Sequence, residues 1–596
     1  MLRESNPFSD SLFVGFVTSV SPTVTQVSFP SSLLLKKFYS ADNSFHALTG
    51  EYVIIEGSGN GFLGKITEIA LPENERLELT ENKFEKQSFH PKGKIEILLC
   101  FDNYILKAKK GLNELPPVSA KVFLCSNEFL NFLMKDFGNK EKVESVYIPL
   151  ATLPKDASHV INISSQSLFG RHCAVVGTTG GGKSWTIAKL IEEVQSNNGK
   201  AILIDATGEF KPLSNGNAGI KYLSFNIPEN QVFIDYKNLK ESDLIAMFRP
   251  AGQTQLPKFQ EALRSLRLRH IINNDDSDRK NHNTVTEVLT FTDAGGNGSS
   301  VCFEKQFRRR NAFSFVYTLY PEVNRETCFF DIKHLSRQIQ LECVNEFPTN
   351  RDSPRPPETS FGSINDRDLG NCHSLISRIR STLSNKSFSA AFGFSQQEGA
   401  TDLISEVEKF INPDDETNIL ILSVEHVSTE NNLREILVNA IGRLLLEASL
   451  HKKFKNQSTG ENKKSLLLFL DEAHLFLNKK IKDEYSIEVE LNAFERIAKE
   501  CRKYGLFLVL STQMPRDIPR GVLSQMGTFI VHRLINQQDR EAIEFACSDA
   551  NKSSLAFLPI LSSGEALLTG VDFPMPMIIK VIEPNVKPDS ETPKVF

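Results

Sequence analysis

The sequence predicts an α/β protein built around a parallel β-sheet with helices on both faces. Six continuous apolar runs follow residue 170, with helical patterns between several of them, as in strands that are buried on both sides. Before them, short alternating segments are separated by Gly, Pro and Asn, which is typical of a small β-barrel or sandwich. A long stretch with helical periodicity interrupts the apolar runs. We therefore expect an N-terminal barrel, a sheet domain and a mainly helical insertion.

Composition limits the class of protein. The 596 residues predict about three or four domains, and a content of 40% hydrophobic and 24% charged residues is ordinary for a soluble globular protein. The net charge of −5 gives no overall attraction to nucleic acid, so any such contact must come from a local surface. The nine cysteines lack a C-x-x-C pair, which argues against a disulfide framework or a zinc site. Without a signal-peptide pattern or a long apolar run, we expect a cytoplasmic protein with no membrane span.

The first part of the chain, residues 1–105, is expected to form the barrel, and residues 106–155 a connector. The connector holds Pro116-Pro117 and a candidate helix at Asn127–Lys135. The candidate barrel strands are Phe13–Val20, Val24–Phe29, Tyr52–Glu56, Leu63–Ile69 and Lys94–Cys100.

The sheet domain is expected in two pieces, 156–231 and 418–582. Helices are expected at Leu433–Leu450 and Glu488–Lys503. The candidate strands are residues 172–177, 200–206, 418–424, 466–473, 506–513 and 528–534.

Residues 232–417 exceed what one compact sheet domain needs, and they are interpreted as an inserted, largely helical subdomain. Within it, 284–347 mixes strand-like runs with charge, and 346–358 is a proline-rich loop. The polar tail 583–596 is expected to be disordered or an extended arm. The candidate helices of the insertion are Tyr236–Phe248, Lys258–Asn273, Leu375–Leu383 and Asp402–Ile411.

The segment 173–193 holds the most specific motif of the chain. Gly177, Gly182, Lys183 and Ser184 satisfy G-x-x-x-x-G-K-[ST] between a strand pattern and a helical pattern. In that setting, backbone N–H groups surround the phosphates of ATP, Lys183 adds positive charge, and the Ser184 hydroxyl binds Mg²⁺. The residues expected to bind ATP are Gly177, Thr178, Thr179, Gly180, Gly181, Gly182, Lys183, Ser184 and Trp185.

Two later strand ends supply candidate groups for hydrolysis. The strand pattern 466–470 is followed by Asp471, which is placed to hold Mg²⁺, and Glu472, which is placed to deprotonate the attacking water. An acidic pair that caps the next helix is the alternative. The strand pattern 506–512 is followed by Gln513, whose amide could sense the γ-phosphate, or could be an ordinary polar strand end.

Basic residues give weaker signals. Arg496, Arg502, Arg533 and Arg540 are candidates for an arginine that stabilises transferred charge, often from a neighbouring molecule. Two further groups could touch DNA phosphates, although a solvated helix face or a protein contact explains them better. These groups are Arg264, Arg267, Arg269 and His270, and Arg308, Arg309 and Arg310.

Six blocks of sequence, taken in order, resemble the HerA family, in the HerA–FtsK branch of ring-forming ATPases. They are VVGTTGGGKS at 175–184, LIDATGEF at 203–210, LLLFLDEAH at 466–474, FERIAKECRKYGLFLVLSTQMP at 494–515, LSQMGTFIVHRLINQQD at 523–539 and GEALLTG at 564–570. Ala206-Thr207 departs from the Pro-His expected in most relatives, although Gly208 and Glu209 remain. Residues 284–370 do not resemble the usual insertion of the family.

The resemblance implies a RecA-like core, a homo-hexamer with ATP sites between subunits, and double-stranded DNA in the central pore. It matches Lys183, Ser184, Asp471, Glu472 and Gln513 to nucleotide-handling residues. It favours Arg502, and then Arg533, as the arginine supplied in trans. It also implies a partner effector, a nuclease or a sirtuin-like NAD-consuming protein, docked on the N-terminal barrels. The length and the insertion favour anti-phage defence over repair.

Two other functions remain open at this stage. A HerA-like ring could serve as a scaffold that assembles and activates the effector without moving along DNA. A conjugation-type ATPase is the third reading, against which the barrel-like N-terminus and the lack of a membrane segment count. An intact set of Lys183, Asp471 and Glu472 favours real hydrolysis, and therefore the translocase.

Overall fold

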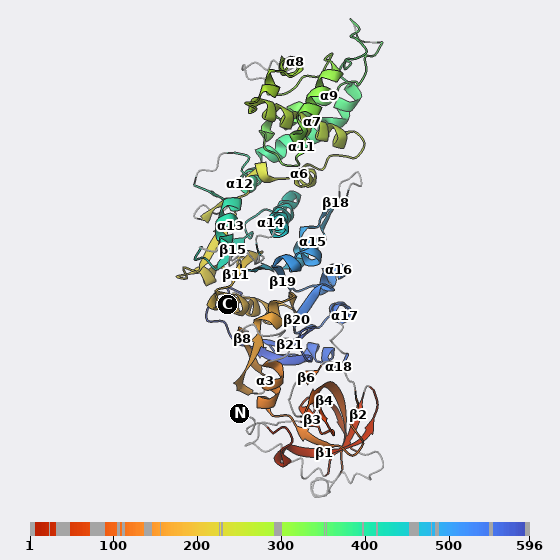
Figure 1. Ribbon diagram of the computed structural model, residues 1–596, viewed down its shortest axis with the longest axis vertical. Coiled ribbons are helices and arrows are strands. Elements are labelled where there is room, and N and C mark those ends of the chain that lie inside the picture. The colour runs from red at the N-terminus through yellow and green to blue at the C-terminus, as the bar shows by residue number, and fades with distance from the viewer. Residues whose placement is uncertain are drawn as a thin grey trace, which may run out of the picture.

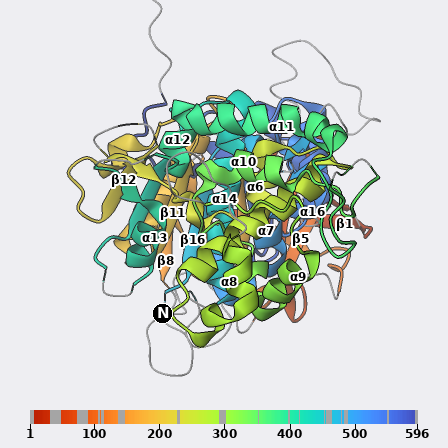
Figure 2. The ribbon, with the colours of Figure 1, turned by 90° about the horizontal axis from the view of Figure 1, so that it is seen from above.

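The chain folds into three parts that are stacked along its long axis (Figure 1). A β-barrel lies at one end, the sheet domain lies in the middle, and a helical insertion lies at the other end. Seen from above, the insertion covers the sheet domain (Figure 2). The computed structural model describes residues 6–590 except for 23, 31–47, 72–89, 104–107, 110–113, 136–145, 155, 226, 228–229, 291–300, 351, 353, 396–398, 413–414, 452–453, 455–463, 478, 483–487 and 548–551.

Six strands form the closed N-terminal barrel, and a seventh, the two-residue strand β6, pairs with β5. The order β2-β1-β7-β3-β4-β5-β6, with an additional β2–β5 pairing, joins the two ends of the sheet. The strand bounds are β1 Phe13–Val20, β2 Thr25–Ser28, β3 Tyr52–Ile55, β4 Asn60–Ala70, β5 Lys92–Asp102, β6 Ala108–Lys109 and β7 Lys121–Leu124.

The expected barrel boundary at residue 105 is wrong, because β7 belongs to the barrel. It pairs antiparallel with both β1 and β3 and so fills the gap between them. The strand follows Pro116-Pro117 and has only four residues, which is why its segment was interpreted as connector. The helix expected in the connector is present as α3, Asn127–Lys135.

The sheet domain has eleven strands in the order β12-β15-β11-β16-β19-β10-β20-β21-β22-β8-β9. The seven strands from β12 to β20 are parallel, as predicted, but β21, β22, β8 and β9 continue the sheet with antiparallel pairings. The sheet is therefore mixed. The bounds are β8 Tyr147–Leu153, β9 Asp156–Ser164, β10 His172–Val176, β11 Lys200–Asp205, β12 Ile220–Ser224, β15 Ile419–Ser423, β16 Leu466–Leu470, β19 Leu506–Thr512, β20 Met526–His532, β21 Glu565–Gly570 and β22 Met577–Val581.

Helices cover both faces of the parallel strands, which explains their unbroken apolar sequences. Along β10, Ala174 and Val176 join the core on the side of α14 and α15, whereas Cys173 and Val175 join the core on the side of α5. Alternate residues thus bury on opposite faces, so no position is left for a polar side chain. The helix bounds are α4 Ser165–Phe169, α5 Lys183–Ser196, α14 Leu433–Leu450, α15 Ala493–Glu500, α16 Arg520–Leu523, α17 Gln537–Ala546 and α18 Lys552–Leu555.

The insertion is helical through most of its described residues. The strand-like runs expected within 284–347 are wrong, since α8, α9 and α10 lie there. The Val and Phe residues of α8 and α9 pack into a small separate core, and tertiary packing overrides the strand propensity of those residue types. Leu335 and Ile339 of α10 join the main core instead. The bounds are α6 Glu241–Phe248, α7 Gln255–Asn273, α8 Asn283–Thr290, α9 Arg310–Leu319, α10 Leu335–Glu342, α11 Asp366–Ser384, α12 Lys386–Phe392 and α13 Leu403–Ile411, with two-residue strands β13 Val232–Phe233 and β14 Thr401–Asp402.

A further correction concerns the helix expected at Glu488–Lys503. Its first four residues form β18, Glu488–Leu491, which pairs antiparallel with β17, Lys479–Lys482. Only the later residues form the helix α15. The hairpin β17–β18 therefore projects from the chain directly after the acidic pair 471–472.

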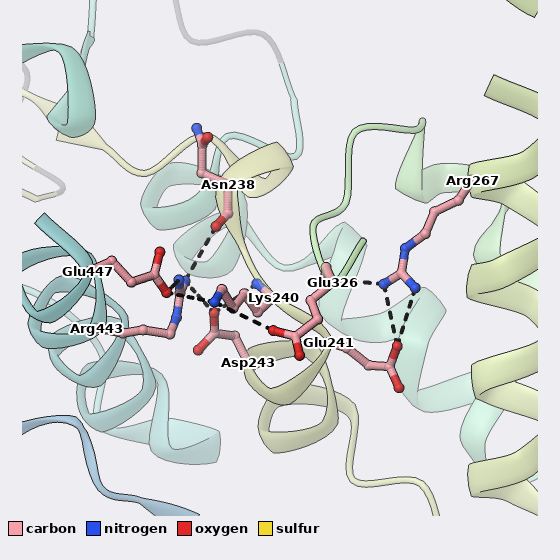
Figure 3. Close-up of polar contacts among 8 residues, drawn as sticks. All are labelled: Asn238, Lys240, Glu241, Asp243, Arg267, Glu326, Arg443 and Glu447. Atoms are coloured by element: carbon pink, nitrogen blue, oxygen red, sulfur yellow. Dashed lines mark hydrogen bonds and ion pairs between the residues drawn. The ribbon is translucent and has the colours of Figure 1, made fainter. Parts of the chain in front are cut away.

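Charged side chains join the insertion to the sheet domain (Figure 3). Arg443 on α14 contacts Asp243 on α6 at 2.6 Å, and both side chains are almost fully buried. Lys240, just before α6, contacts Glu447 on α14 at 2.7 Å and Glu326 of the insertion at 3.4 Å. Because α14 packs directly on the sheet, this cluster fixes how the insertion stands on the core.

Candidate active site

Three chain segments meet where parallel strands of the sheet end. The phosphate-binding loop follows β10, the pair Asp471-Glu472 follows β16, and Gln513 follows β19. These strands are neighbours in the order β16-β19-β10 and run in the same direction. Their carboxyl ends therefore lie side by side, which is the usual position for ligands in an open α/β sheet.

The phosphate-binding loop curls against the next strand of the sheet. Thr178 donates its backbone N–H to the carbonyl of Arg533 at 2.9 Å, directly after β20. Gly182 has φ of +113°, and a Cβ there would lie 3.1 Å from the Cα of Gly564. Both the backbone conformation and the space thus require glycine at the last position before Lys183.

His532 and the segment Ser563–Gly564 form the floor of the loop, and the sequence analysis missed their role. The His532 Nδ1 faces the carbonyl of Glu565 at 2.9 Å, so it carries the proton and donates, and Nε2 accepts from the Thr186 hydroxyl at 2.8 Å. Burial lowers the pKa of His532 to about 4, which keeps the ring neutral. Ser563 donates to the carbonyl of Gly180 at 3.1 Å. These residues lie within the quoted blocks 523–539 and 564–570 or beside them, but only the strand pairing brings them to the loop.

Lys183 begins α5 and is buried beneath the loop. Its ammonium donates to the carbonyl of Thr178 at 3.3 Å. Burial lowers its pKa, although the charges of Glu472, Asp471 and Glu209 act in the opposite direction. A cation held among carboxylates and desolvated in this way is placed to neutralise incoming phosphate oxygens.

The acidic residues of the site fit Mg²⁺. Asp471 is buried, and burial, together with the charges of Glu472, Asp205 and Glu209, raises the pKa of its carboxyl to about 8. A divalent cation bound by Asp471 and the Ser184 hydroxyl would offset this repulsion. Mg²⁺ commonly takes few protein ligands and completes its shell with phosphates and water. When bound, it would supply positive charge to the phosphate oxygens.

Glu472 is held by side chains from both sides of the site. It adopts a left-handed backbone with φ of +44°, and it accepts a hydrogen bond from the amide of Gln513. The Gln513 oxygen accepts from the Thr179 hydroxyl at 2.8 Å, so Gln513 links the phosphate loop to Glu472. His474 Nδ1 lies 3.2 Å from the other Glu472 oxygen. Burial raises the Glu472 pKa, but the contacts with His474 and Gln513 and the charge of Lys183 outweigh it and leave the pKa lowered.

An acidic loop after β11 completes this side of the site. The Asp205 carboxylate accepts the backbone N–H groups of Thr207, Gly208 and Phe210 and so shapes the loop. Burial raises the pKa of Asp205 to about 6. Thr207, which departs from the expected Pro-His, donates its hydroxyl to Asp471 at 3.4 Å. The departure therefore adds a contact to the proposed magnesium ligand.

The two leading arginine candidates lie at opposite edges of the sheet. Arg502 precedes β19 and donates to the carbonyl of Gly170, which precedes β10, so it lies at the amino ends of the strands. The seven residues of β19, at roughly 3.3 Å each, separate it from Gln513 by roughly 20 Å. Arg502 therefore cannot reach the site of its own chain. The backbone carbonyl of Arg533 accepts hydrogen bonds from Thr178 in the phosphate loop of the same chain, and its side chain stays the second candidate for the arginine supplied in trans.

The other basic candidates make contacts within the chain. Arg496 pairs with Glu500 at 3.2 Å, and Arg540 donates to the carbonyl of Ile535 at 2.6 Å. Arg267 is buried and pairs with Glu241 at 3.3 Å. Arg264 stacks on Tyr317, Arg269 on Phe303, and Arg310 on Phe347, whereas Arg309 pairs with Glu287. These contacts occupy the basic side chains within the chain, and the buried Arg267 fits neither a DNA contact nor the solvated helix face that was the alternative.

Within the described part of the chain, no helix is long and apolar enough to span a membrane. The same part holds no group of three or more His, Cys, Asp or Glu side chains that could enclose a metal ion. The candidate site consists of the phosphate loop, the buried Asp471, the ionised Glu472, and Gln513, which is hydrogen-bonded to both the loop and Glu472.

Two family models match this chain, the first over the start of the sheet domain and the beginning of the insertion, the second over the rest of the sheet domain. Residues 148–300 match the model described as "Helicase HerA, central domain", and residues 423–583 match "Helicase HerA-like C-terminal". The matched regions together take in more than half of the chain. They contain every residue of the site described above.

Archaeal proteins are similar to this chain in sequence over most of its length. The "Probable helicase MJECL08" of Methanocaldococcus jannaschii is 23% identical over 550 residues, which are 89% of this chain and 90% of that protein. The "DNA double-strand break repair helicase HerA" of Saccharolobus solfataricus is 21% identical over 552 residues, with 89% and 87% covered.

Solved structures with a similar course of the chain include two bacterial proteins. The "Bacterial conjugative coupling protein TrwBdeltaN70" has a TM-score of 0.41 at 14% identity and covers 78% of this chain and 94% of its own. VirB4 of Thermoanaerobacter pseudethanolicus has a TM-score of 0.40 at 13% identity, with 74% and 98% covered.

Proposed function

We propose that this chain, which belongs to the HerA helicase family, is an ATPase that moves double-stranded DNA through a ring of six copies beside a partner effector. The chain is an ATPase by family and by the composition of its site. The DNA, the ring and the partner are the proposed parts. Relatives named as DNA double-strand break repair helicases support DNA as the cargo.

The observation that carries the ring is the position of Arg502. It lies at the amino ends of the strands, whereas Lys183, Glu472 and Gln513 lie at the carboxyl ends. When copies are arranged head to tail, the amino-end edge of one copy faces the carboxyl-end edge of the next. Each ATP site would then receive Arg502 from a neighbour, as arginine fingers are received in other phosphoryl-transfer enzymes.

The site residues take the following roles in this proposal. Residues 177–185 bind the nucleotide, and Lys183 stabilises charge on the phosphates. Ser184 and Asp471 hold Mg²⁺, Glu472 deprotonates the attacking water, and Gln513 reports whether a γ-phosphate is present. The Thr179–Gln513–Glu472 chain supports that last role, because Gln513 is hydrogen-bonded to both the phosphate loop and the proposed base.

The N-terminal barrel is the proposed docking platform for the effector. It lies at the end of the molecule opposite to the insertion, and its β1 presents Phe16 with 44% of its surface exposed (Figure 1). Aromatic side chains of this kind are common anchors in protein interfaces. We propose a nuclease or a sirtuin-like NAD-consuming enzyme as the effector, and anti-phage defence as the setting, which the unusual insertion supports.

The decisive experiment tests translocation directly. Purified full chain is incubated with ATP and a linear duplex that carries a triplex-forming strand, and displacement of that strand is followed over time. We expect displacement by the natural chain and none by Glu472→Gln, which keeps the shape of the side chain but loses the base. We also expect duplex DNA binding to fall steeply as salt is raised, through counterion release.

The scaffold alternative has its own outcome in the same experiment. A ring that hydrolyses ATP and activates its effector, yet displaces no strand at low salt, would establish a scaffold and overturn the translocase. A chain lacking residues 1–124 should retain nucleotide binding and lose the effector. Retention of the effector by that shortened chain would contradict the docking role of the barrel.

A further inference from the structure

The C-terminal arm, residues 583–590, runs along the phosphate-loop helix toward the ATP site. It leaves the sheet after β22, and Asn585 donates both its backbone N–H and its side-chain amide to Glu192 near the end of α5, at 2.8 and 2.7 Å. Two residues on, the Lys587 ammonium lies 4.8 Å from the ring centre of Trp185, near the start of α5. The arm thus follows α5 from its last turns to its first.

The arm ends at the acidic loop of the site. The backbone N–H of Asp589 donates to the carbonyl of Glu209 at 2.8 Å. Glu209 lies in the loop that Asp205 shapes, and its charge acts on Lys183. The arm therefore has contacts along α5 and with the acidic loop, and of the two alternatives expected for the tail, residues 583–590 follow the extended arm and not the disordered segment. Residues 591–596 lie outside the described part of the chain.

Trp185 occupies the position from which a bound nucleoside extends. In a phosphate loop, the backbone cradles the α- and β-phosphates, the lysine reaches the β- and γ-phosphates, and the following Ser or Thr binds Mg²⁺. The residue after Ser184 is then next to the α-phosphate, which carries the ribose and base. Trp185 is partly exposed at this point, and one side of its indole lies against the arm.

We propose that Trp185 and the C-terminal arm form the nucleoside-binding wall of the ATP site. The purine base stacks on the indole, and Asn585, Lys587 and Asp589 hold the arm closed beside the base and the ribose. This inference rests on the proposed ATPase site. It adds a binding surface for the nucleoside, which none of the phosphate-loop residues other than Trp185 supplies.

The contacts of the arm favour a ligand-binding role over a purely structural one, in which the arm would only stabilise α5. Asn585, Val586 and Lys587 are exposed, and only Pro584 and Pro588 of the arm are buried, so the arm buries little apolar surface of its own. Its contacts are polar instead: the side chains of Asn585 and Lys587 reach α5, and the backbone N–H of Asp589 reaches the acidic loop. Lys587 also pairs with Glu583 within the arm at 3.5 Å. An arm held by a few polar contacts can open and close at low cost, as a segment that admits a nucleotide must.

The experiment compares a ligand that has a base with a ligand that lacks one. Isothermal titration measures Mg-ATP and Mg-tripolyphosphate binding to the full chain, to a chain ending at Pro584, and to a control chain ending at Ser590. Aromatic stacking of a base predicts a loss of about fivefold or more in ATP affinity when the wall is removed. We expect that loss in the chain ending at Pro584 and in Trp185→Ala, with tripolyphosphate affinity unchanged. The control chain that ends at Ser590 should bind ATP normally.

Trp185 is the one tryptophan of the chain, so its fluorescence gives an independent reading. Mg-ATP should change that fluorescence, and Mg-tripolyphosphate should leave it unaltered. Equal weakening of both ligands in the shortened chain would show that the arm only supports α5, and unchanged ATP affinity would show that it is no part of the site; either result overturns the inference. Lys183→Ala should lose both ligands. If the full chain binds neither ligand, the ATPase proposal itself fails.

Discussion

Two inactive variants should restore ATP hydrolysis when they are mixed, because the proposed site draws its residues from two copies. Glu472→Gln removes the base at the carboxyl ends of the strands, and Arg502→Ala removes the guanidinium at the amino ends. An arginine side chain spans about 7 Å, whereas β19 places Arg502 roughly 20 Å from Gln513 of the same chain. Each variant alone should bind ATP but hydrolyse it more slowly than the natural chain by a factor of about 10³ or more.

The size of the rescue follows from counting interfaces. A working interface needs an Arg502→Ala copy to supply Glu472 and a Glu472→Gln copy to supply Arg502. In an equal, random mixture, each requirement is met half of the time, so about one quarter of the sites should be active if they work independently. The assay is steady-state phosphate release across a series of mixing ratios, with the maximum at the equal mixture.

Matched controls make this result interpretable. Arg496→Ala, on an exposed arginine that pairs with Glu500, should hydrolyse ATP like the natural chain. Arg533→Ala should give no rescue with Glu472→Gln, because Arg533 lies beside the phosphate loop of its own chain. If Arg502→Ala alone keeps full activity, or if no mixture recovers activity, the assignment of Arg502 is refuted. Rescue by Arg533→Ala in its place would keep the shared site and move the arginine.

Three further predictions concern stability and the shape of the site. Asp243→Ala should lower the thermal midpoint of unfolding and speed proteolysis of the insertion. Loss of the buried partner of Arg443 lowers the free energy of unfolding by about 3 kcal/mol or more. The control Glu261→Ala, in a more exposed pair with Lys258, should change little. Burial lowers the pKa of His172 to about 4, so the unfolded chain binds the proton at a higher pH than the folded chain does, starting near pH 6.5. Relative to His172→Gln, the natural chain should therefore lose about 2 kcal/mol of stability between pH 7.5 and 5. If denaturation shows the same difference in stability between the two chains across that range, the prediction is contradicted. Gly208→Ala should weaken Mg-ATP binding in a titration, since φ is +81° and the new Cβ would lie 2.1 Å from the Glu425 carboxylate; normal binding would show that the acidic loop is not part of the site.

Much of the sheet could be predicted from the sequence because its parallel strands are buried on both faces. The central residues of β10, β11 and β16 are all apolar, and that signal survives without any knowledge of their neighbours. The strands β7, β8 and β22 were missed, because short segments become strands only when a partner from elsewhere in the chain pairs with them. Their sequences carry little local signal.

Some residues of the candidate site could be predicted from the sequence, and others could not. Three groups of the site each follow a buried parallel strand that is recognisable in the sequence, and such strands end at one edge of the sheet. That the phosphate loop, Asp471-Glu472 and Gln513 lie close together could therefore be predicted. His532 and Gly564 reach the loop through the β10–β20 and β20–β21 pairings, which no local pattern specifies. The helices α8 and α9 were misread because their Phe, Val and Tyr residues favour strands locally, whereas their packing within the insertion favours helix.

The pairing of β8 with β22 has a consequence for the order in which the protein is made. Ala151 pairs with Val581, so an early strand of the sheet has its partner almost at the end of the chain. The barrel draws its strands only from the first part of the sequence and can form while translation continues. The sheet domain must wait until β21 and β22 have left the ribosome, and until then β8 and β20 each lack one of their final neighbours. Such waiting strands favour wrong pairing, so production of this chain should depend on chaperones that hold the unfinished sheet.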